Sequence, residues 1–340
     1  MAAASGLLLL GCLSVAVPPA KAWLLVPLEI LFWPLLIVNI VLVVWAAARR
    51  SRAILIPLVA VIPALFFTGR YIRFSGGDGP SEGSNTLKVV TYNVGRFHSG
   101  KNLEGKSDRD SIMRYLAGTD ADIVCLQEVW LSERDFAATL SGLMKGYTAT
   151  YYLYTGKKGR FGNVILSRKA PLRKGHIEFD SSRNLAVWAD FKAGGETIRV
   201  YDCHLESYAI SPAGIAKALL EKKDREVLED TGRKMRGSIR KRATQVEQMF
   251  REIEESPVGT LVCGDFNDTP LSWTYHKMSH GHRDSFTEAG RGIGGSFPAA
   301  FPLTRLDYMF APESMKAVSY SSPSLGYSDH RPVTCEFEIH

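Results

Sequence analysis

Polar side chains stand directly after several apolar runs of this chain, and these are the residues whose types could support chemistry. Asp265 and Asn267 follow the apolar stretch Gly259–Val262. Val, Ile, Leu and Tyr are readily buried in strands, whereas Asp, Asn, Glu and His at strand ends must be solvated, paired or bound to a metal. The same arrangement recurs at Asn93, Glu128, His204, Asp307 and the run Ser328–His330.

One such strand end would mean little, but their number indicates a shared site. The set offers carboxylate and amide oxygens, which are hard ligands suited to Mg²⁺, together with histidines that could contact an anion. It lacks the clustered Cys and His spacing of a zinc site. The pattern therefore predicts metal-assisted phosphoryl chemistry.

From about Thr86 to His340 the chain resembles the endonuclease/exonuclease/phosphatase superfamily. This superfamily includes deoxyribonuclease-like enzymes, abasic-site endonucleases, inositol-phosphate phosphatases and neutral sphingomyelinases. The resemblance rests on the order and spacing of six motifs, since any one alone would be weak, and Gly162–Ser167 is also similar to a strand of the family. The motifs are Thr91-Tyr92-Asn93, Leu126-Gln127-Glu128, His204-Leu205, Gly264-Asp265-Phe266-Asn267, Leu306-Asp307-Tyr308 and Ser328-Asp329-His330.

The resemblance implies a metal site and a general base. Glu128 resembles the main metal carboxylate, with Asn93 beside it and Asp329 as a further ligand; the expected ion is Mg²⁺, with Mn²⁺ as a substitute. Asp265 resembles the base that takes a proton from the attacking water, and Asn267 the amide that holds the phosphate. An unperturbed Asp is a weak base at neutral pH, so a metal-lowered water pKa and a partly desolvated carboxylate are both needed.

The histidines also acquire roles from the resemblance. His330 resembles the histidine that donates to a phosphoryl oxygen, and Asp307 the carboxylate that orients its ring, a pairing that favours a charged imidazole. His204 matches a second histidine that contacts phosphate, although a histidine after a strand is often only structural. Asn163, in the family-like strand, is predicted to bind substrate. Asp202, by contrast, is interpreted as a strand-end residue without a role in the site.

The amino-terminal part of the chain is dominated by three apolar runs, Gly6–Val17, Trp23–Ala48 and Ala53–Thr68. About 20 apolar residues cross a bilayer, so the second run is long enough and the third is just long enough. The first run is either a retained helix or a cleaved signal. Residues 1–73 are therefore predicted to be a membrane anchor with two or three transmembrane helices.

The charge pattern of the anchor predicts its orientation. Arg49, Arg50 and Arg52 separate the second and third runs. Positively charged loops tend to stay in the cytoplasm, so the third helix would carry the chain outward. The chain is expected to be a multi-pass protein of the cell membrane with its catalytic domain on the non-cytoplasmic side. The five scattered cysteines form no recognisable disulfide framework that would test this orientation.

The remaining chain is predicted to contain a linker and one α/β domain. Residues 74–85 are rich in Gly and Ser and are expected to be flexible. For residues 86–340 the resemblance implies a four-layer α/β/β/α sandwich of two mixed sheets, preceded by the transmembrane helices. Gly290–Ser296 is interpreted as a mobile loop near the site. Helices are predicted over Asp108–Ala117, Ser132–Met144 and much of Pro212–Glu255.

A basic stretch stands out from the modest formal net charge of +6. Thr231–Arg242 contains no acidic residue. It is either a solvated helix face or a surface that binds lipid headgroups or nucleic-acid phosphates. On the second interpretation, Arg233, Lys234 and Arg236 contribute to substrate binding.

The sequence thus favours a membrane-anchored, Mg²⁺-dependent hydrolase of phosphodiester bonds in nucleic acid, nucleotide or phospholipid headgroups. The alternative is a phosphomonoesterase of the inositol-phosphate phosphatase type. A non-catalytic binding module is disfavoured, since binding alone would not need a base, a metal carboxylate and a histidine together. The motifs do not separate diester from monoester, because the loops that select substrate are what vary in this superfamily.

Overall fold

The structure is a computed structural model, and it describes residues 1–98, 108–132, 142, 144–208, 225–298 and 301–340. The chain divides into two compact units. The sandwich unit comprises Arg73–Glu206, Met249–Asn267 and Gly281–His340, and the helical unit comprises Met1–Ile72, Ser207–Gln248 and Asp268–His280.

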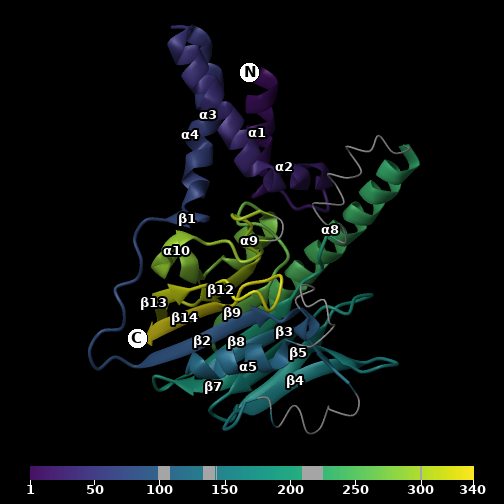
Figure 1. Cartoon of the computed structure of the whole chain (residues 1–340), viewed down its shortest axis with the longest axis vertical. Helices are drawn as coiled ribbons and strands as arrows, with labels where there is room; N and C mark the ends of the chain where they lie inside the picture. The colour runs from purple at the N-terminus through teal and green to yellow at the C-terminus, as the bar shows by residue number, and fades with distance from the viewer. Residues whose placement is uncertain (99–107, 133–141, 143, 209–224, 299–300) are drawn as a thin grey trace. The chain divides into compact units, whose positions relative to one another are not determined.

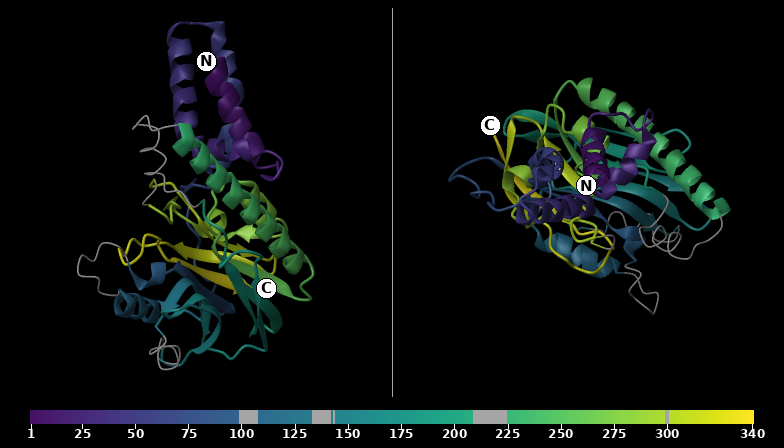
Figure 2. Two further views of the ribbon diagram at one scale, coloured as in Figure 1. Left: turned by 90° about the vertical axis from the view of Figure 1, so that its right-hand side faces the viewer. Right: turned by 90° about the horizontal axis from the view of Figure 1, so that it is seen from above.

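The sandwich unit contains two six-stranded sheets. In each sheet one central pair of strands is parallel, β2 with β3 and β8 with β9, while the other pairs are antiparallel. Both sheets are therefore mixed, as predicted, and Figures 1 and 2 show their strands from three directions. The first sheet has the order β10 (Arg283–Asp284), β12 (Asp307–Ala311), β9 (Gly259–Asp265), β8 (Glu196–His204), β7 (Leu185–Ala193), β6 (Arg173–Glu178). The second has the order β13 (Met315–Ser321), β14 (Val333–Ile339), β2 (Thr86–Asn93), β3 (Ile123–Leu131), β5 (Arg160–Ser167), β4 (Thr148–Thr155).

The main core of this unit lies between the sheets. Alternate residues of the strands face it, such as Val89 and Cys125 from one sheet and Val200 and Cys263 from the other. A second core lies on the outer face of the β2–β3 sheet, where α5 (Arg109–Gly118) contributes the buried Ile112 and Leu116. On the outer face of the other sheet, the Tyr201 hydroxyl donates to the carbonyl oxygen of Glu252, 3.2 Å away, in the last turn of α8 (Arg225–Glu254).

The predicted helices agree with the structure where they can be compared. The helix expected at Asp108–Ala117 is α5, and the end of the one expected in Pro212–Glu255 is α8. Nearly all of Ser132–Met144 lies outside the described residues. Two short helices and two short strands complete the sandwich unit and its edges: η3 (Gly95–Phe97), α10 (Ser285–Ala289), β1 (Ile72–Arg73) and β11 (Gly292–Ile293). The short helix α9 (Trp273–Met278) belongs to the helical unit.

The segment expected to be a flexible linker makes ordered contacts within the sandwich unit. The backbone N–H of Gly77 donates to the carbonyl oxygen of Ala289 at 3.0 Å, and that of Gly79 donates to Val318 at 3.0 Å. A Cβ atom at Gly77 would lie 2.1 Å from the carbonyl oxygen of Val318. Glycine is thus required here by close packing of two backbones, which explains part of the composition that suggested flexibility.

The apolar runs of the helical unit form α1 (Ala2–Ser14), η1 (Trp23–Leu25), α2 (Val26–Ile30), α3 (Phe32–Ala48), η2 (Arg52–Ile54) and α4 (Leu55–Thr68). Side chains of α1, α3 and α4 share a core that includes Leu8, Leu36 and Ala60. Among the described residues, none of these helices taken singly is both long and apolar enough to cross a bilayer. The segments Trp23–Ile30 and Phe32–Ala48 reach that length only together, and they meet at a bend of 67°.

The basic stretch of α8 is not uniformly exposed, which corrects the expectation that all of Thr231–Arg242 lies on the surface. Arg233, Lys234 and Arg236 are exposed, whereas Arg242 is 2% exposed. The Arg242 Nε atom lies 3.2 Å from Oδ2 of Asp268, and its guanidinium carbon lies 4.0 Å from the centre of the Tyr208 ring. The helix turns Arg242 to the same face as the buried Met235, Ile239 and Val246, because these positions recur every three or four residues.

Candidate active site

The register of the two sheets brings the predicted site residues to one end of the sandwich. In the first sheet, Asp265 is paired with His204 on β8 and with Asp307 on β12. In the second sheet, Asn93 at the end of β2 is paired with Gln127, the neighbour of Glu128 on β3. Because β2 and β3, like β8 and β9, are parallel, their carboxyl ends meet at the same edge.

Glycine and strained backbone set the direction of the key side chains. Gly264 has φ +135°, and a Cβ atom there would lie 1.9 Å from the carbonyl oxygen of Cys203, so β9 approaches β8 too closely for any side chain. Glu128 has φ +55° beside an irregularity in its pairing with β5, and Asn267 has φ +51°. Left-handed backbone at non-glycine residues costs about 1–3 kcal/mol and collects at functional sites.

Asp265 is the most heavily bonded carboxylate of the group. It is 1% exposed; Asn93 Nδ2 donates to its Oδ2 at 2.9 Å, and the backbone N–H of Asn267 donates to its Oδ1 at 2.9 Å. The Asn267 side chain donates to the same carboxylate at 3.3 Å and to the carbonyl oxygen of Leu205 at 2.9 Å. Burial raises the pKa of Asp265, and the charge of His330 opposes that rise. A raised pKa makes the carboxylate a stronger base than an exposed Asp.

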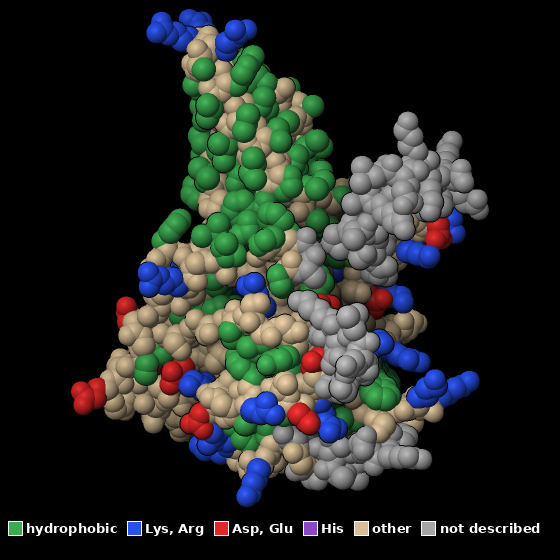
Figure 3. All heavy atoms as spheres, in the orientation of Figure 1, with side chains coloured by type: hydrophobic (Ala, Val, Ile, Leu, Met, Phe, Trp, Pro, Cys, Tyr) green, Lys and Arg blue, Asp and Glu red, His purple; other side chains and the backbone are tan. Residues whose placement is uncertain are grey.

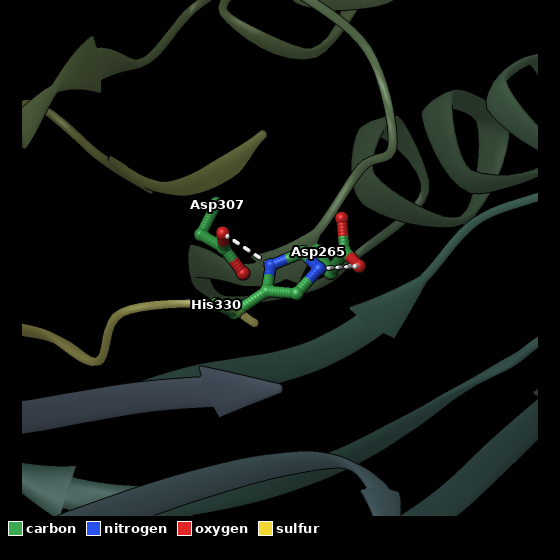
Figure 4. A group of neighbouring side chains, drawn as sticks. All are labelled: Asp265, Asp307 and His330. Carbon is green, nitrogen blue, oxygen red and sulfur yellow. Dashed lines mark hydrogen bonds and ion pairs between the residues drawn. The ribbon is translucent and has the colours of Figure 1, made fainter. Parts of the chain in front are cut away.

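The His330 ring lies between two carboxylates (Figure 4). Its Nδ1 is 2.9 Å from Oδ2 of Asp307, and its Nε2 is 3.6 Å from Oδ2 of Asp265. Burial alone would lower the pKa of His330, but the charges of Asp307 and Asp265 outweigh it and raise the pKa to about 10. The imidazole is therefore charged at neutral pH.

Asp307 is positioned by a loop that the sequence did not mark as ordered. The Ser296 hydroxyl oxygen accepts from the backbone N–H groups of Leu306 at 3.0 Å and Asp307 at 3.1 Å. Ser296 is fully buried, and its backbone N–H donates to the carbonyl oxygen of Thr304 at 2.9 Å. Gly290–Ser296 was interpreted as a mobile loop, but its last residue fixes the start of β12. The Gly-rich composition concealed this, because it is shared by flexible loops and tight backbone contacts.

Glu128 is the open carboxylate of the site, with a side chain that is 27% exposed. Its Oε1 lies 3.3 Å from Nδ2 of Asn93 and 3.7 Å from Nε2 of His204. His204 Nε2 also lies 3.9 Å from Oδ2 of Asp265, so this histidine stands between the two carboxylates. The predicted residues Asn93, Glu128, His204, Asp265, Asn267, Asp307 and His330 thus form one connected group.

Asp329 lies at the edge of this group, and Asn163 is directed into the protein. Asp329 is exposed, with its Oδ1 3.3 Å from the Ser328 hydroxyl. Asn163 is 1% exposed and donates to the carbonyl oxygen of Asp202 at 3.1 Å, which ties the two sheets together. That contact supplies a structural role for Asn163, and its part in substrate binding stays a prediction, as does that of Arg233, Lys234 and Arg236 on α8.

A buried polar network below the site was not recognised in the sequence. Gln127 Nε2 donates to Oδ1 of Asp202 at 2.6 Å and to the Thr91 hydroxyl at 2.8 Å. Asp202 was interpreted as an unimportant strand-end residue, but it is fully buried, and burial raises its pKa well above its ordinary value. The signal in the sequence was its place two residues before His204 on the strand, because period-two alternation turns both side chains to the same face.

Two groups of side chains could hold a divalent cation. Asp265, Asp307 and His330 offer ligand atoms within 4.8 Å of one another. A His330 ring that is protonated between two carboxylates has no lone pair to give, so this group is better suited to proton transfer. Glu128 offers carboxylate oxygens at the exposed side of the site, and these fit a cation such as Mg²⁺. The Nδ2 of Asn93 faces Glu128, and its Oδ1 accepts from the backbone N–H of Gly95 at 3.0 Å, so the part of Asn93 in metal binding stays a prediction.

Comparison with known proteins agrees with this arrangement. Residues 90–330 match the Endonuclease/Exonuclease/phosphatase family. The chain belongs to that family. Its members are metal-dependent hydrolases of phosphate esters, and this chain is an enzyme of the same kind. Residues 2–71 match a separate domain of unknown function.

The individual proteins that resemble this chain share little sequence identity with it. The uncharacterized protein YbhP of Escherichia coli is 28% identical over 290 residues, which cover 75% of this chain and 97% of YbhP. An endonuclease/exonuclease/phosphatase from Beutenbergia cavernae has a TM-score of 0.56 at 16% identity, covering 75% of this chain and 72% of that one. D. rerio TDP2 complexed with a single-strand DNA product has a TM-score of 0.52 at 18% identity, covering 75% and 99%. The similar structures show that the fold is shared, and the match to the family model shows the class of enzyme to which the chain belongs.

Proposed function

We propose that this protein is a Mg²⁺-dependent phosphodiesterase that cleaves its substrate by attack of water. The observation that carries the proposal is the meeting of a buried base, a charged histidine and an open carboxylate at one end of the sandwich. A bound Mg²⁺ would supply a lower pKa for water and partial neutralisation of the phosphate charge. The single-strand DNA product held by D. rerio TDP2 supports a phosphodiester substrate.

Each residue of the group then has a chemical task. Asp265 accepts the proton of the attacking water, and burial makes it basic enough to do so. His330 is held charged by Asp307 and donates to a phosphoryl oxygen as negative charge develops there. Asn267 and His204 complete the contacts to phosphate. Glu128 and Asn93 would hold the cation, with Asp329 at the edge of the site as a further ligand.

The direct test is a titration of Mg²⁺ with the full chain in mild detergent. Hydrolysis of bis-p-nitrophenyl phosphate should require the cation, stop in excess EDTA and return when Mg²⁺ is restored, and Mn²⁺ should substitute. p-Nitrophenyl phosphate, a monoester with the same leaving group, should be a poorer substrate. Full activity in EDTA would refute the metal-dependent mechanism, and a strong preference for the monoester would favour a phosphomonoesterase.

We further propose that the helical unit anchors the enzyme in the cell membrane. Val41, Val44 and Phe66 on α3 and α4 are 60%, 64% and 83% exposed, and apolar side chains cover these helices in Figure 3. Apolar surface of this extent on a soluble protein marks a contact with lipid or another protein. Arg49, Arg50 and Arg52 lie between α3 and α4, which favours a cytoplasmic turn and a catalytic domain on the non-cytoplasmic side.

A reporter enzyme fused after His340 tests both parts of this second proposal. The fusion should stay with membranes after an alkaline carbonate wash, and a reporter that works only outside the cytoplasm should be active. Release by carbonate would argue against insertion. A reporter active only in the cytoplasm would reverse the orientation.

A further inference from the structure

Three aromatic side chains stand side by side next to the open carboxylate Glu128. Trp130 on β3 is paired with Phe161 on β5, which is paired in turn with Tyr154 on β4. Directly paired residues point to the same face of a sheet, and neighbouring strands are about 4.8 Å apart. We call these three residues the aromatic row. The strands that carry it are neighbours in Figure 1.

The aromatic row continues the inner face of its sheet beyond the core. Phe161 alternates along β5 with Asn163 and Ile165, and Ile165 is buried between the two sheets. Tyr154 packs against the edge of that core, and exposure increases along the row toward Trp130. Trp130 is 36% exposed, while Phe161 and Tyr154 are partly buried. The row therefore offers aromatic surface two residues from Glu128, on the side of the site that is open.

Arg96 connects the row to the site. Its guanidinium carbon lies 5.3 Å from the centre of the Phe161 ring, and its Nε lies 3.9 Å from Oε2 of Glu128. The side chain is 65% exposed, so this long ion pair leaves most of the guanidinium open to a ligand.

The backbone holds Arg96 in this position at a cost. Gly95, Arg96 and Phe97 have φ values of +52°, +59° and +61° in succession. Only glycine adopts such values without strain, and the two residues that follow it are held there by the Phe97 side chain, which is 2% exposed.

Further positive charge lies on the hairpin between β4 and β5, whose turn carries the exposed Lys157 and Lys158. Glu178 is the acidic neighbour at the far end of the row, beside Tyr154. Cations beside exposed aromatic rings are the features that bind single-stranded nucleic acid, since the cations attract phosphates and the rings stack on bases.

We propose that Arg96 and the aromatic row form a subsite that stacks an unpaired nucleobase next to the scissile phosphate. This assignment rests on the proposed phosphodiesterase activity and narrows its substrate to single-stranded nucleic acid. A choline headgroup fits less well, because the guanidinium over Phe161 repels a quaternary ammonium, whereas a neutral base meets no such repulsion. In a duplex the faces of the bases are covered by their neighbours, so the strand must be single.

Two oligomers with equal phosphate charge test the proposal in the full-length protein with Mg²⁺. One is an eight-nucleotide thymidine oligomer, and the other is an abasic oligomer of the same length, both labelled with fluorescein at the same end. Stacking of one base corresponds to about 5- to 150-fold in binding, so the thymidine oligomer should have a KM lower by about that factor. Trp130→Ala and Phe161→Leu should remove the difference by raising KM for the thymidine oligomer alone, while Phe161→Tyr keeps it.

Tyr151→Ala is the matched control. Tyr151 is 44% exposed on β4 and is paired with Val164, which faces the opposite side of the sheet. This variant should leave both KM values unchanged. Arg96→Gln should raise KM for both oligomers alike, because it contacts phosphate whether or not a base is present. Melting temperatures of all variants establish that they fold.

The outcomes separate the subsite from the activity. Equal KM values for the two oligomers in the wild type, or an unchanged ratio in Trp130→Ala and Phe161→Leu, would overturn the subsite while leaving the phosphodiesterase intact. Faster hydrolysis of sphingomyelin vesicles than of the thymidine oligomer would assign the site to a lipid headgroup. No Mg²⁺-dependent cleavage of bis-p-nitrophenyl phosphate or of any of these substrates would refute the proposed function itself.

Discussion

The two halves of the active site differ in how their charges are satisfied. In the closed half, Asp265 and Asp307 are buried against a charged His330, and each carboxylate lies within 4 Å of the ring. In the open half, Glu128 is partly exposed and its contacts with His204 and Arg96 are longer than hydrogen bonds. Burial and close pairing shift the pKa values of groups that exchange protons, whereas loosely paired groups can exchange partners. The closed half is thus suited to proton transfer and the open half to binding.

Replacement of the buried base should have the largest effect. Asp265→Asn keeps the shape of the side chain and its contact with Asn93, but it cannot accept a proton. Turnover should fall by about 10²–10⁴-fold, the usual contribution of general base catalysis. The Mg²⁺ concentration for half-maximal rate should stay the same, as measured by titration of the metal in steady-state assays. A parallel loss of metal affinity would show that the two halves do not act separately.

Glu128→Gln should change the metal dependence instead. Substitutions around a metal site commonly cost 10–100-fold in affinity, and removal of a direct ligand should cost at least about 10-fold. The half-maximal Mg²⁺ concentration should rise by that factor, and high Mg²⁺ should restore part of the rate. Glu196→Gln is the matched control, because Glu196 is an exposed carboxylate at the opposite end of β8. If Glu128→Gln lowered the rate without any shift in metal dependence, the ion would have to be assigned elsewhere.

The buried network of Asp202 and Gln127 should affect the stability of the fold rather than the rate of hydrolysis. The pKa of Asp202 is raised in the folded protein, so the stability that this group permits is present at low pH and is lost as pH rises toward the folded pKa. Asp202→Asn cannot ionise and can still accept from Gln127. In urea unfolding, the free energy of unfolding of the wild type minus that of the variant should be smaller at pH 8 than at pH 5. Asp110→Asn, at an exposed carboxylate, should show no such difference. A difference that is independent of pH would mean that Asp202 is ionised in the folded as well as the unfolded protein throughout this range, so that its folded pKa lies below it.

The strand-end residues of both halves were predictable from the sequence. Asp265 of the closed half and Glu128 of the open half end apolar runs, and a polar group at the end of a buried run must be paired, solvated or bound. The strained conformation of Arg96 had no such signal, because it depends on where Phe97 is buried.

The burial of Arg242 and Asp202 could have been predicted from periodicity, but charge obscured it. Arg242 belongs to the apolar face of α8 by its three- and four-residue spacing from Ile239 and Val246. The ion pair between Arg242 and Asp268 could not be predicted, because the two residues are far apart in the chain and only the folded structure brings them together. The apolar runs of the helical unit predict helices, but composition alone does not determine where a helix bends, as it does between Ile30 and Phe32.

The smallest effect is expected from the exposed cations of α8. Arg233, Lys234 and Arg236 face solvent, and Lys234 is already paired with Asp230 at 2.7 Å, so they attract a polyanion only through screened, long-range forces. Changing all three to Gln should raise KM for the thymidine oligomer and leave kcat unchanged. If each cation contacts one phosphate, the slope of log affinity against log salt should become shallower by about 2, since each contact to a single strand contributes about 0.7.

Changing Arg173, Lys174 and Lys192 to Gln removes the same charge from β6 and β7 and is the control. An equal effect from both triplets would reflect net charge alone, and a fall in kcat would place α8 in the catalytic centre. A change confined to the α8 triplet would assign these three cations to substrate binding.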